Sequence, residues 1–271
     1  DNKNVFIAIA LSMSVLLFWA AFFETPRPVD NNIGLAHTRL SIIDLSKNGS
    51  QPMTSADKQT VISFNGEIYN FKDLKKNIPN VKFNSNTDTE VILEYYNLFG
   101  IDQTIEKMNG MYAFSIYDKK NNELILARDR VGKKPIYYYY DENFFIWGSE
   151  INIFKSSPIL QKLKIDSNAV WNYFNVGYIP SPISIFQKIK KIKPGEILRL
   201  NLNKNSITKN RKYFINKTNF LINNNFEDTL KDAVKIRTIS DVPYGVFLSS
   251  GIDSTLVASI LKDLNKNVDS F

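Results

Sequence analysis

Short apolar runs separated by turn-forming residues fill the chain from Ile33 to about residue 200, and this spacing constrains the fold more than any other feature. Such runs, about 4–8 residues long and bounded by Asn, Gly or Asp, are typical of β-strands. Asn65-Gly66 is the strongest short hairpin signal among the boundaries. The predicted strands are Thr60–Phe64, Met111–Tyr117, Glu123–Arg128, Pro135–Tyr140 and Phe144–Trp147.

Two segments within this series have the pattern of helices. Thr87–Phe99 (TDTEVILEYYNLF) has Thr87 or Asp88 as a candidate N-cap and Gly100 as a candidate C-cap. Ser167–Val176 is the second predicted helix. Strands mixed with a few helices predict an α+β domain in which antiparallel sheets are stacked and flanked by helices.

The composition excludes several kinds of site. Among 271 residues there are no Cys and one His, so no disulfide, thiolate metal site or cysteine nucleophile can form. A lone His also argues against a multi-histidine metal site. The net charge is +7, but the lysines are scattered among Asn and Ile rather than clustered. We therefore expect no nucleic-acid partner.

The amino terminus differs in character from the rest of the chain. Val5–Phe23 contains nineteen residues without a charge, which at about 1.5 Å per residue is long enough to cross a bilayer. Pro26 and Pro28 end any helix, and no small-residue cleavage site of a signal peptide follows the run. We therefore predict a transmembrane anchor; the alternative is a buried core helix. Residues 1–29 (DNKNVFIAIALSMSVLLFWAAFFETPRPV) resemble the amino-terminal anchor of bacterial membrane-protein insertases.

The carboxy-terminal part begins after a change of composition. Residues 201–225 are rich in Asn, Lys and Thr, which predicts a linker. The segments after it are predicted as an amphipathic helix over Phe226–Ser240, a strand over Val242–Leu248, a loop over Ser249–Asp253 and a helix over Ser254–Leu264. A strand, a small-residue loop and a helix in this order are typical of the opening of a parallel α/β unit.

The loop before the last helix is a candidate phosphate site. Backbone N–H groups at a helix amino terminus favour an anion, and the hydroxyls of Ser249 and Ser254 can add donors. Asp253 is placed to hold a Mg²⁺ that bridges phosphates. The loop is not a Walker motif, because no Gly-Lys-Ser/Thr follows. The spacing alone leaves open an ordinary strand-to-helix turn in which Asp253 is the cap.

A second set of polar residues can suit an amino acid. Arg39 and Asp88 offer opposite charges for its carboxylate and ammonium groups. Asn65 and Gly66 can supply two N–H donors to an oxyanion. The alternatives are a structural ion pair and a hairpin turn. Arg128-Asp129-Arg130 is interpreted as a structural loop, and His37 as a satisfied polar residue.

Seven ordered segments over residues 32–271 together resemble glutamine-hydrolysing asparagine synthetases. They are LAHTRLSIIDLSKNGSQPM (35–53), FNGEIYNF (64–71), TDTEVIL (87–93), MNGMYAFSIYD (108–118), LARDRVGKKPIYYY (126–139), YIPSPISIFQKIKKIKPGE (178–196) and SDVPYGVFLSSGIDST (240–255). The resemblance implies an N-terminal-nucleophile-type αββα sandwich that hydrolyses glutamine, followed by an ATP-pyrophosphatase domain that uses its ammonia. ATP and Mg²⁺ are the implied cofactors, and glutamine, aspartate and ATP the implied small-molecule partners.

The resemblance assigns roles to individual residues. Arg39 would bind the glutamine carboxylate, Asp88 its ammonium, and Asn65 and Gly66 would form the oxyanion hole. The other residues implied at the glutamine pocket are Leu40, Ser41, Ile42, Ile43 and Glu67. Those implied at ATP are Leu248, Ser249, Gly251, Asp253 and Ser254. Ser250 stands where the family usually has glycine, and its Cβ would be strained if its φ were positive.

The family's nucleophile is an amino-terminal cysteine, which this chain lacks. We therefore expect an inactive fragment or hybrid with an anchor segment (1–29), a glutaminase domain without its first strands (30–205), and a linker with a truncated synthetase domain (206–271). Family resemblance implies a cytoplasmic protein, membrane-anchored if residues 5–23 insert, and is compatible with a homodimer. The alternatives are a related amidotransferase with another acceptor, such as a β-lactam or peptide, and a catalytically dead, membrane-tethered glutamine-binding protein.

Overall fold

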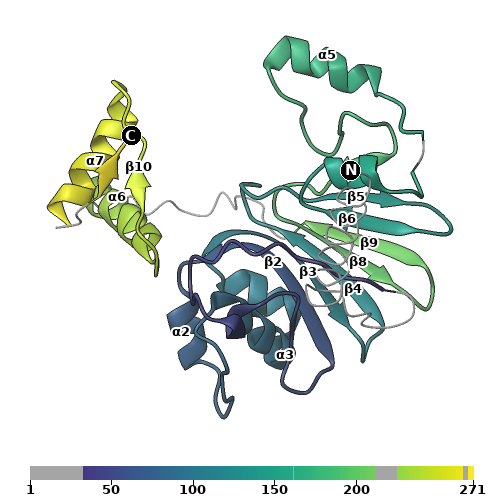
Figure 1. Cartoon of the computed structure of the whole chain (residues 1–271), viewed down its shortest axis with the longest axis horizontal. Coiled ribbons are helices and arrows are strands. Elements are labelled where there is room, and N and C mark those ends of the chain that lie inside the picture. The colour runs from purple at the N-terminus through teal and green to yellow at the C-terminus, as the bar shows by residue number, and fades with distance from the viewer. Residues whose placement is uncertain (1–32, 161, 212–224, 265–267) are drawn as a thin grey trace, which may run out of the picture. The chain divides into compact units, whose positions relative to one another are not determined.

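The computed structural model describes residues 33–160, 162–211, 225–264 and 268–271 (Figure 1). The chain divides into two compact units, residues 1–38 and 39–271. Every helix and strand of the described residues belongs to the second unit. Within the described residues no helix has the length and apolarity needed to cross a membrane. The transmembrane prediction for residues 5–23 lies outside the described residues.

A six-stranded antiparallel sheet forms the centre of the fold, in the order β1-β2-β3-β4-β8-β9. Its strands are β1 (Met53–Thr54), β2 (Thr60–Ile68), β3 (Gly110–Asp118), β4 (Glu123–Arg128), β8 (Glu196–Asn201) and β9 (Ser206–Arg211). The predicted strands at 111–117 and 123–128 are confirmed. Because β9 pairs with β8, residues 206–211 extend the sheet, although their composition predicted a linker.

The hairpin predicted at Asn65-Gly66 is wrong. Strand β2 runs straight through both residues, with Asn65 opposite Ala113 and Gly66 opposite Tyr112 on β3. A Cβ added at Gly66 would collide with the carbonyl oxygen of Met111 and lie 2.8 Å from the Cα of Tyr112. The glycine therefore serves a close approach of two strands, not a turn.

A smaller antiparallel sheet packs against the central sheet. It has the order β6-β5-β7 and consists of β5 (Tyr137–Tyr140), β6 (Phe145–Gly148) and β7 (Ile189–Lys191). Successive residues of β4 point to opposite faces, and both faces are buried. Leu124 and Leu126 join the apolar cluster shared with Tyr138 of the smaller sheet. Ile125 and Ala127 join the cluster on the opposite face.

Helices cover the outer faces of the two sheets (Figure 1). Apolar residues of α2 (Phe71–Lys76) and α3 (Asp88–Lys107) form one core with the central sheet. Phe154 of α4 (Asn152–Ser156) packs with residues of the smaller sheet. The four layers of helices, sheet, sheet and helix confirm the predicted stacking of antiparallel sheets.

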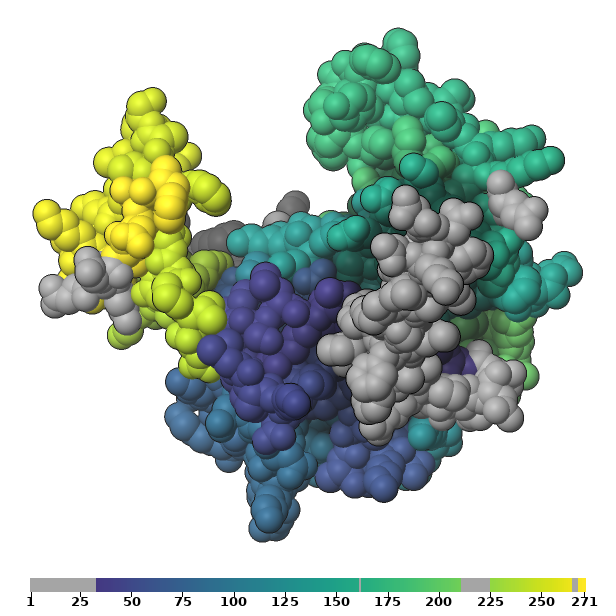
Figure 2. Space-filling model, in the orientation of Figure 1, coloured from purple at the N-terminus to yellow at the C-terminus, as the bar shows by residue number. Residues whose placement is uncertain are grey.

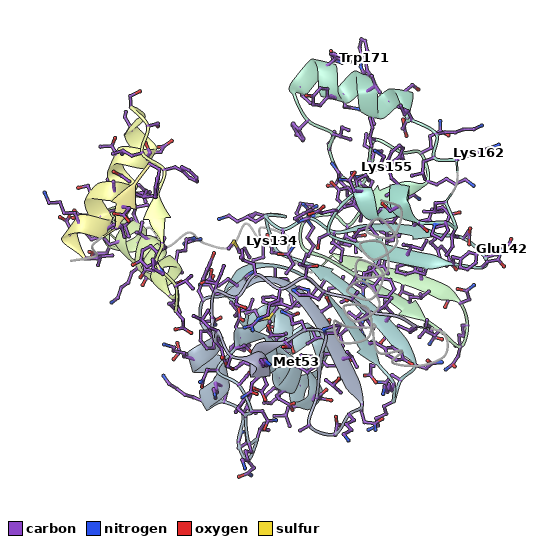
Figure 3. All side chains as sticks on the ribbon, viewed as in Figure 1. Met53, Lys134, Glu142, Lys155, Lys162 and Trp171 are labelled. Carbon is purple, nitrogen blue, oxygen red and sulfur yellow. The ribbon has the colours of Figure 1, made fainter. Side chains whose placement is uncertain are left out.

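The start of α3 follows the predicted signal, whereas the helix ends at Lys107 and not at Phe99 as predicted. The Thr87 hydroxyl accepts a hydrogen bond from the Glu90 N–H at 3.1 Å, as an N-cap does. Gly100 has φ of 73° and interrupts the helix where the C-cap was predicted. After this kink a second helical stretch continues to Lys107. Helix α5 (Ser167–Val176) has the predicted bounds and lies on the lobe above the sheets (Figure 2). Its Trp171, labelled in Figure 3, is 70% exposed.

The carboxy-terminal residues form the beginning of a parallel α/β unit. Its elements are α6 (Phe226–Lys235), the 3₁₀ turn η2 (Ile236–Thr238), β10 (Gly245–Val246), α7 (Ile252–Asp263) and β11 (Asp269–Ser270). β10 and β11 pair in parallel, which confirms the predicted strand, loop and helix order. The helix predicted to Ser240 ends at Lys235, and the predicted strand is shorter than the apolar run.

Candidate functional site

The loop after residue 38 is built around the guanidinium of Arg39. Arg39 donates hydrogen bonds to the carbonyl oxygens of Ile43 at 2.8 Å, Asp44 at 2.6 Å and Ser46 at 3.1 Å. These bonds use three of its five N–H donors, which leaves two for a carboxylate. A Cβ at Gly49 would collide with the guanidinium, so a glycine is needed beside it. Of the other predicted pocket residues here, Ser41 and Ile42 are half-buried and Leu40 is 82% exposed.

Asp44 ties this loop to the start of α3. Its backbone has a positive φ of 57°, and its carboxylate accepts hydrogen bonds from the N–H groups of Ser46 at 2.9 Å and Asn86 at 2.7 Å. The bond from Asn86, followed by that from Ser46, holds the pKa of Asp44 below its usual value. The loop carrying Arg39 is thereby attached two residues before Asp88.

Asp88 lies in the first turn of α3 and is buried. Its carboxylate accepts the N–H of Ile68 at 2.9 Å, at the end of β2. Burial raises the pKa of Asp88 to about 6, against the backbone hydrogen bonds and the attraction of Arg39, which lower it. The two charged groups predicted to hold one amino acid therefore interact electrostatically in the fold.

Glu67 is a second buried carboxylate close to Asp88. Within the described residues its Oε1 atom is buried and has no hydrogen-bond partner. Burial, followed by repulsion from Asp88, raises the pKa of Glu67 to about 7, while Lys134 and Arg237 act in the opposite direction. Two mutually repelling carboxylates and an unpaired carboxylate oxygen are suited to receive an ammonium group.

Asn65 lies two residues before Glu67, on the same face of β2. Its side-chain amide donates to the hydroxyl of Ser149, after β6, at 3.3 Å. Gly66 points to the opposite face and is part of the β2–β3 ladder. Their joint role as an oxyanion hole stays a prediction.

The Arg128-Asp129-Arg130 loop is structural, as predicted. The buried Asp129 carboxylate accepts the N–H groups of Val131, Lys133 and Lys134 at 2.9–3.1 Å. Arg128 donates from the other side to the carbonyl oxygens of Gly132, Lys134 and Ile192. These bonds hold the backbone of Lys134, labelled in Figure 3, whose positive charge lowers the pKa of Glu67.

The candidate phosphate loop precedes α7, whose N-cap is Gly251. The hydroxyl of Ser249 lies 2.9 Å from that of Ser254 and accepts the N–H of Gly251 at 3.2 Å. Ser250 is not among the described residues with positive φ, so its Cβ causes no strain of the kind considered above. Leu248, at the end of the strand, is 45% exposed. Two hydroxyls at a helix amino terminus fit an anion.

Asp253 lies exposed in the first turn of α7. Among the described residues, no group of three or more His, Cys, Asp or Glu side chains could hold a metal ion. A Mg²⁺ at Asp253 would therefore depend on phosphate oxygens for its other ligands. The magnesium role stays a prediction.

Sequence reasoning missed the residues that connect the pocket. Asp44 binds the loop of Arg39 to α3, and Asp241 accepts the N–H of Asp44 at 2.7 Å. Arg237 lies over the ring of Tyr69 at 5.0 Å. Asp44 and Asp241 both fall inside segments quoted above for the family resemblance, but nothing local marks them as partners.

Two family models match the two parts of the chain. Residues 27–214 match the family model described as a glutamine amidotransferase domain, and residues 225–271 match the model described as asparagine synthase. A putative glutamine-hydrolysing asparagine synthetase 2 of Methanocaldococcus jannaschii is 41% identical over 256 residues, which cover 86% of this chain and 48% of that protein. Asparagine synthetase 1 of Bacillus subtilis is 33% identical over 253 residues, covering 89% of this chain and 39% of that protein.

A relative with a different name also matches. Amidase chry2 of Gibberella zeae is 30% identical over 248 residues, which cover 88% of this chain and 36% of that protein. The chain thus spans less than half the length of each of these three relatives. The matches lend no support to the insertase resemblance of residues 1–29.

Proposed function

This chain belongs to the glutamine amidotransferase domain family, and we propose that it holds the glutamine pocket and the first nucleotide-binding loop of a glutamine-hydrolysing asparagine synthetase. The proposed reaction transfers ammonia from glutamine to the side-chain carboxylate of aspartate with consumption of ATP. The observation that carries the proposal is the grouping of Arg39 with the buried carboxylates Glu67 and Asp88.

The pocket matches the charges of an α-amino acid. Arg39 uses three N–H donors on the carbonyl oxygens of its loop and has two N–H donors left for the α-carboxylate. Asp88 and Glu67 receive the α-ammonium, which removes their mutual repulsion and gives the buried Oε1 of Glu67 a partner. The amide of Asn65 and the N–H of Gly66 are proposed to hold the side-chain carbonyl oxygen of glutamine.

The nucleotide part of the proposal rests on the loop before α7. The residues proposed around the ATP phosphates are Ser249, Gly251, Asp253 and Ser254, with Leu248 near the adenosine. ATP, with Mg²⁺, would adenylate the acceptor carboxylate with release of pyrophosphate, and ammonia would then displace AMP. The two hydroxyls and the amino terminus of α7 orient the phosphates.

A chain without cysteine has a glutamine pocket but no thiol nucleophile. We propose that these 271 residues bind glutamine without hydrolysing it, because the donors that stabilise an oxyanion cannot replace the attacking sulfur. The second candidate is a related amidotransferase that acts on another acceptor, and the similarity to a protein named amidase supports this alternative.

Isothermal titration calorimetry tests the glutamine pocket. Glutamine should bind the parent chain, whereas its analogue without the α-ammonium group should bind at least about tenfold more weakly, because a buried charge pair is left unmatched. Asp88→Asn should weaken glutamine binding similarly, and Asp73→Asn, at an exposed carboxylate of α2, should not change it. Equal affinity for glutamine and the analogue would refute the assignment.

A further inference from the structure

A short segment of the carboxy-terminal part touches the pocket of the amino-terminal part. Asp241 accepts a hydrogen bond from the N–H of Asp44 at 2.7 Å and donates its own N–H to the carbonyl of Ile42 at 2.9 Å. Ile239 packs against the apolar core between the central sheet and its helices. Residues 236–241 therefore contact the loop of Arg39 through both backbone and side chain.

The same segment also reaches the end of β2. The guanidinium of Arg237 lies 5.0 Å from the centre of the Tyr69 ring, within the range of a cation–π interaction. Tyr69 is buried and follows Glu67 by two residues. Arg237 thus brings a positive charge to the side of the pocket where the two carboxylates lie.

The contact at Asp44 falls on a backbone position that needs support. A residue other than glycine with positive φ is strained unless its surroundings hold it. Asp44 is held on all its polar groups, since its carbonyl accepts from Arg39, its carboxylate accepts from Ser46 and Asn86, and its N–H donates to Asp241. Removing Asp241 leaves the N–H of this strained residue unmatched.

We infer that residues 236–241 act as a clamp that positions the glutamine pocket, with Asp241 fixing the loop of Arg39 and Arg237 setting the charge beside Glu67. This inference rests on the proposed glutamine pocket and goes beyond it, because it makes the synthetase part a component of the glutaminase site. Asp241 and Arg237 are positioning residues, and neither contacts the reacting atoms.

Hydrogen exchange of the full chain tests the clamp without any ligand. In Asp241→Ala the amide of Asp44 should exchange at least about tenfold faster than in the parent, because its acceptor is lost. Asp241→Asn keeps an acceptor oxygen and should give an intermediate rate. Asp263→Ala, at an exposed carboxylate near the end of α7, is the matched control and should leave the rate unchanged. Unchanged exchange in Asp241→Ala would overturn the clamp.

Glutamine titrations of the same proteins test the consequence for the pocket. Asp241→Ala should raise the Kd for glutamine about fivefold and Asp263→Ala should not. Faster exchange with an unchanged Kd would show that the loop is held for stability alone and would overturn the positioning role. If the parent binds no glutamine, the proposed pocket fails, and the clamp on the loop is decided by the exchange rates.

The role of Arg237 is tested by the pH dependence of glutamine binding, which a purely structural role would leave unchanged. The charged groups that act on Glu67 are Asp88, Lys134 and Arg237. Because Arg237 favours the ionised form of Glu67, Arg237→Gln should shift the pH midpoint of glutamine binding upwards, and Arg237→Lys should restore it. An unshifted midpoint in Arg237→Gln, with the protein folded by circular dichroism, would contradict the role given to Arg237.

Discussion

Glu67→Gln should make the ligand-free protein more stable at neutral pH while it weakens glutamine binding. The side chain of Glu67 is buried, and its pKa is raised from 4.5 to about 7 by burial and by Asp88. The folded chain therefore holds a proton on Glu67 between these pH values, whereas the unfolded chain does not. Stability from this group is fully present below about pH 4.5 and is lost as pH rises to about 7.

The size of the effect follows from the shift. A rise from 4.5 to about 7 corresponds to about 3 kcal/mol at about 1.36 kcal/mol per pKa unit. The side chain of a glutamine at position 67 cannot ionise, so Glu67→Gln should raise the free energy of unfolding by about 2–3 kcal/mol at pH 8. At pH 4.5 both folded side chains are neutral, and the difference should be close to zero.

Urea unfolding followed by circular dichroism at both pH values measures this difference. Glu142→Gln, at the exposed position labelled in Figure 3, is the matched control and should change stability little at either pH. A gain for Glu67→Gln that is the same at pH 4.5 and pH 8, or no gain at pH 8, would refute the argument from a buried carboxylate. A weaker affinity for glutamine should accompany the gain.

Three further outcomes are expected. Gly66→Ala should destabilise the chain by about 2–3 kcal/mol in urea unfolding, because the added Cβ meets the backbone of β3. Gly251→Ala should cost less than about 1 kcal/mol, because its Cβ meets only the Ser249 hydroxyl, at 3.2 Å. Equal losses of stability in the two variants would contradict the close approach of β2 and β3 at Gly66. Asp129→Ala should speed proteolysis between β4 and β5, since three loop N–H groups lose their acceptor, and an unchanged cleavage rate would contradict its structural role. The purified chain should release no glutamate from glutamine above the uncatalysed rate in a coupled assay, and a clear excess would show that a cysteine is not required.

The regular elements of this protein could be predicted where the signal is local. Thr87 and Gly100 mark the cap and the interruption of α3 through their own hydrogen-bonding and backbone preferences. The apolar run of Glu123–Arg128 indicated a strand, and the structure adds that its alternate residues fill two different cores. The strand, loop and helix that end at Asp263 could also be predicted, because each has a local signal.

The candidate site could be predicted only in part from the sequence. Arg39, Glu67 and Asp88 were identified because the segments around them resemble those of a known family. The opposite charges of Arg39 and Asp88 gave a reason for an amino-acid pocket, but no local pattern indicated that Glu67 would be buried with an unpaired oxygen. That property comes from the place of β2 within the central sheet, beside β3 and the first turn of α3, which the residues near Glu67 do not encode alone.

The sequence by itself therefore determined the kinds of element, their order and the residue types available for chemistry. The tertiary structure decided two things that local signals could not. It placed Asn65-Gly66 within a strand, because the need for a close approach to β3 outweighs the turn preference of these residues. It also joined Asp44 to Asp241 across 197 residues of chain, and a hydrogen bond over that distance exists only once both segments have packed on the same core.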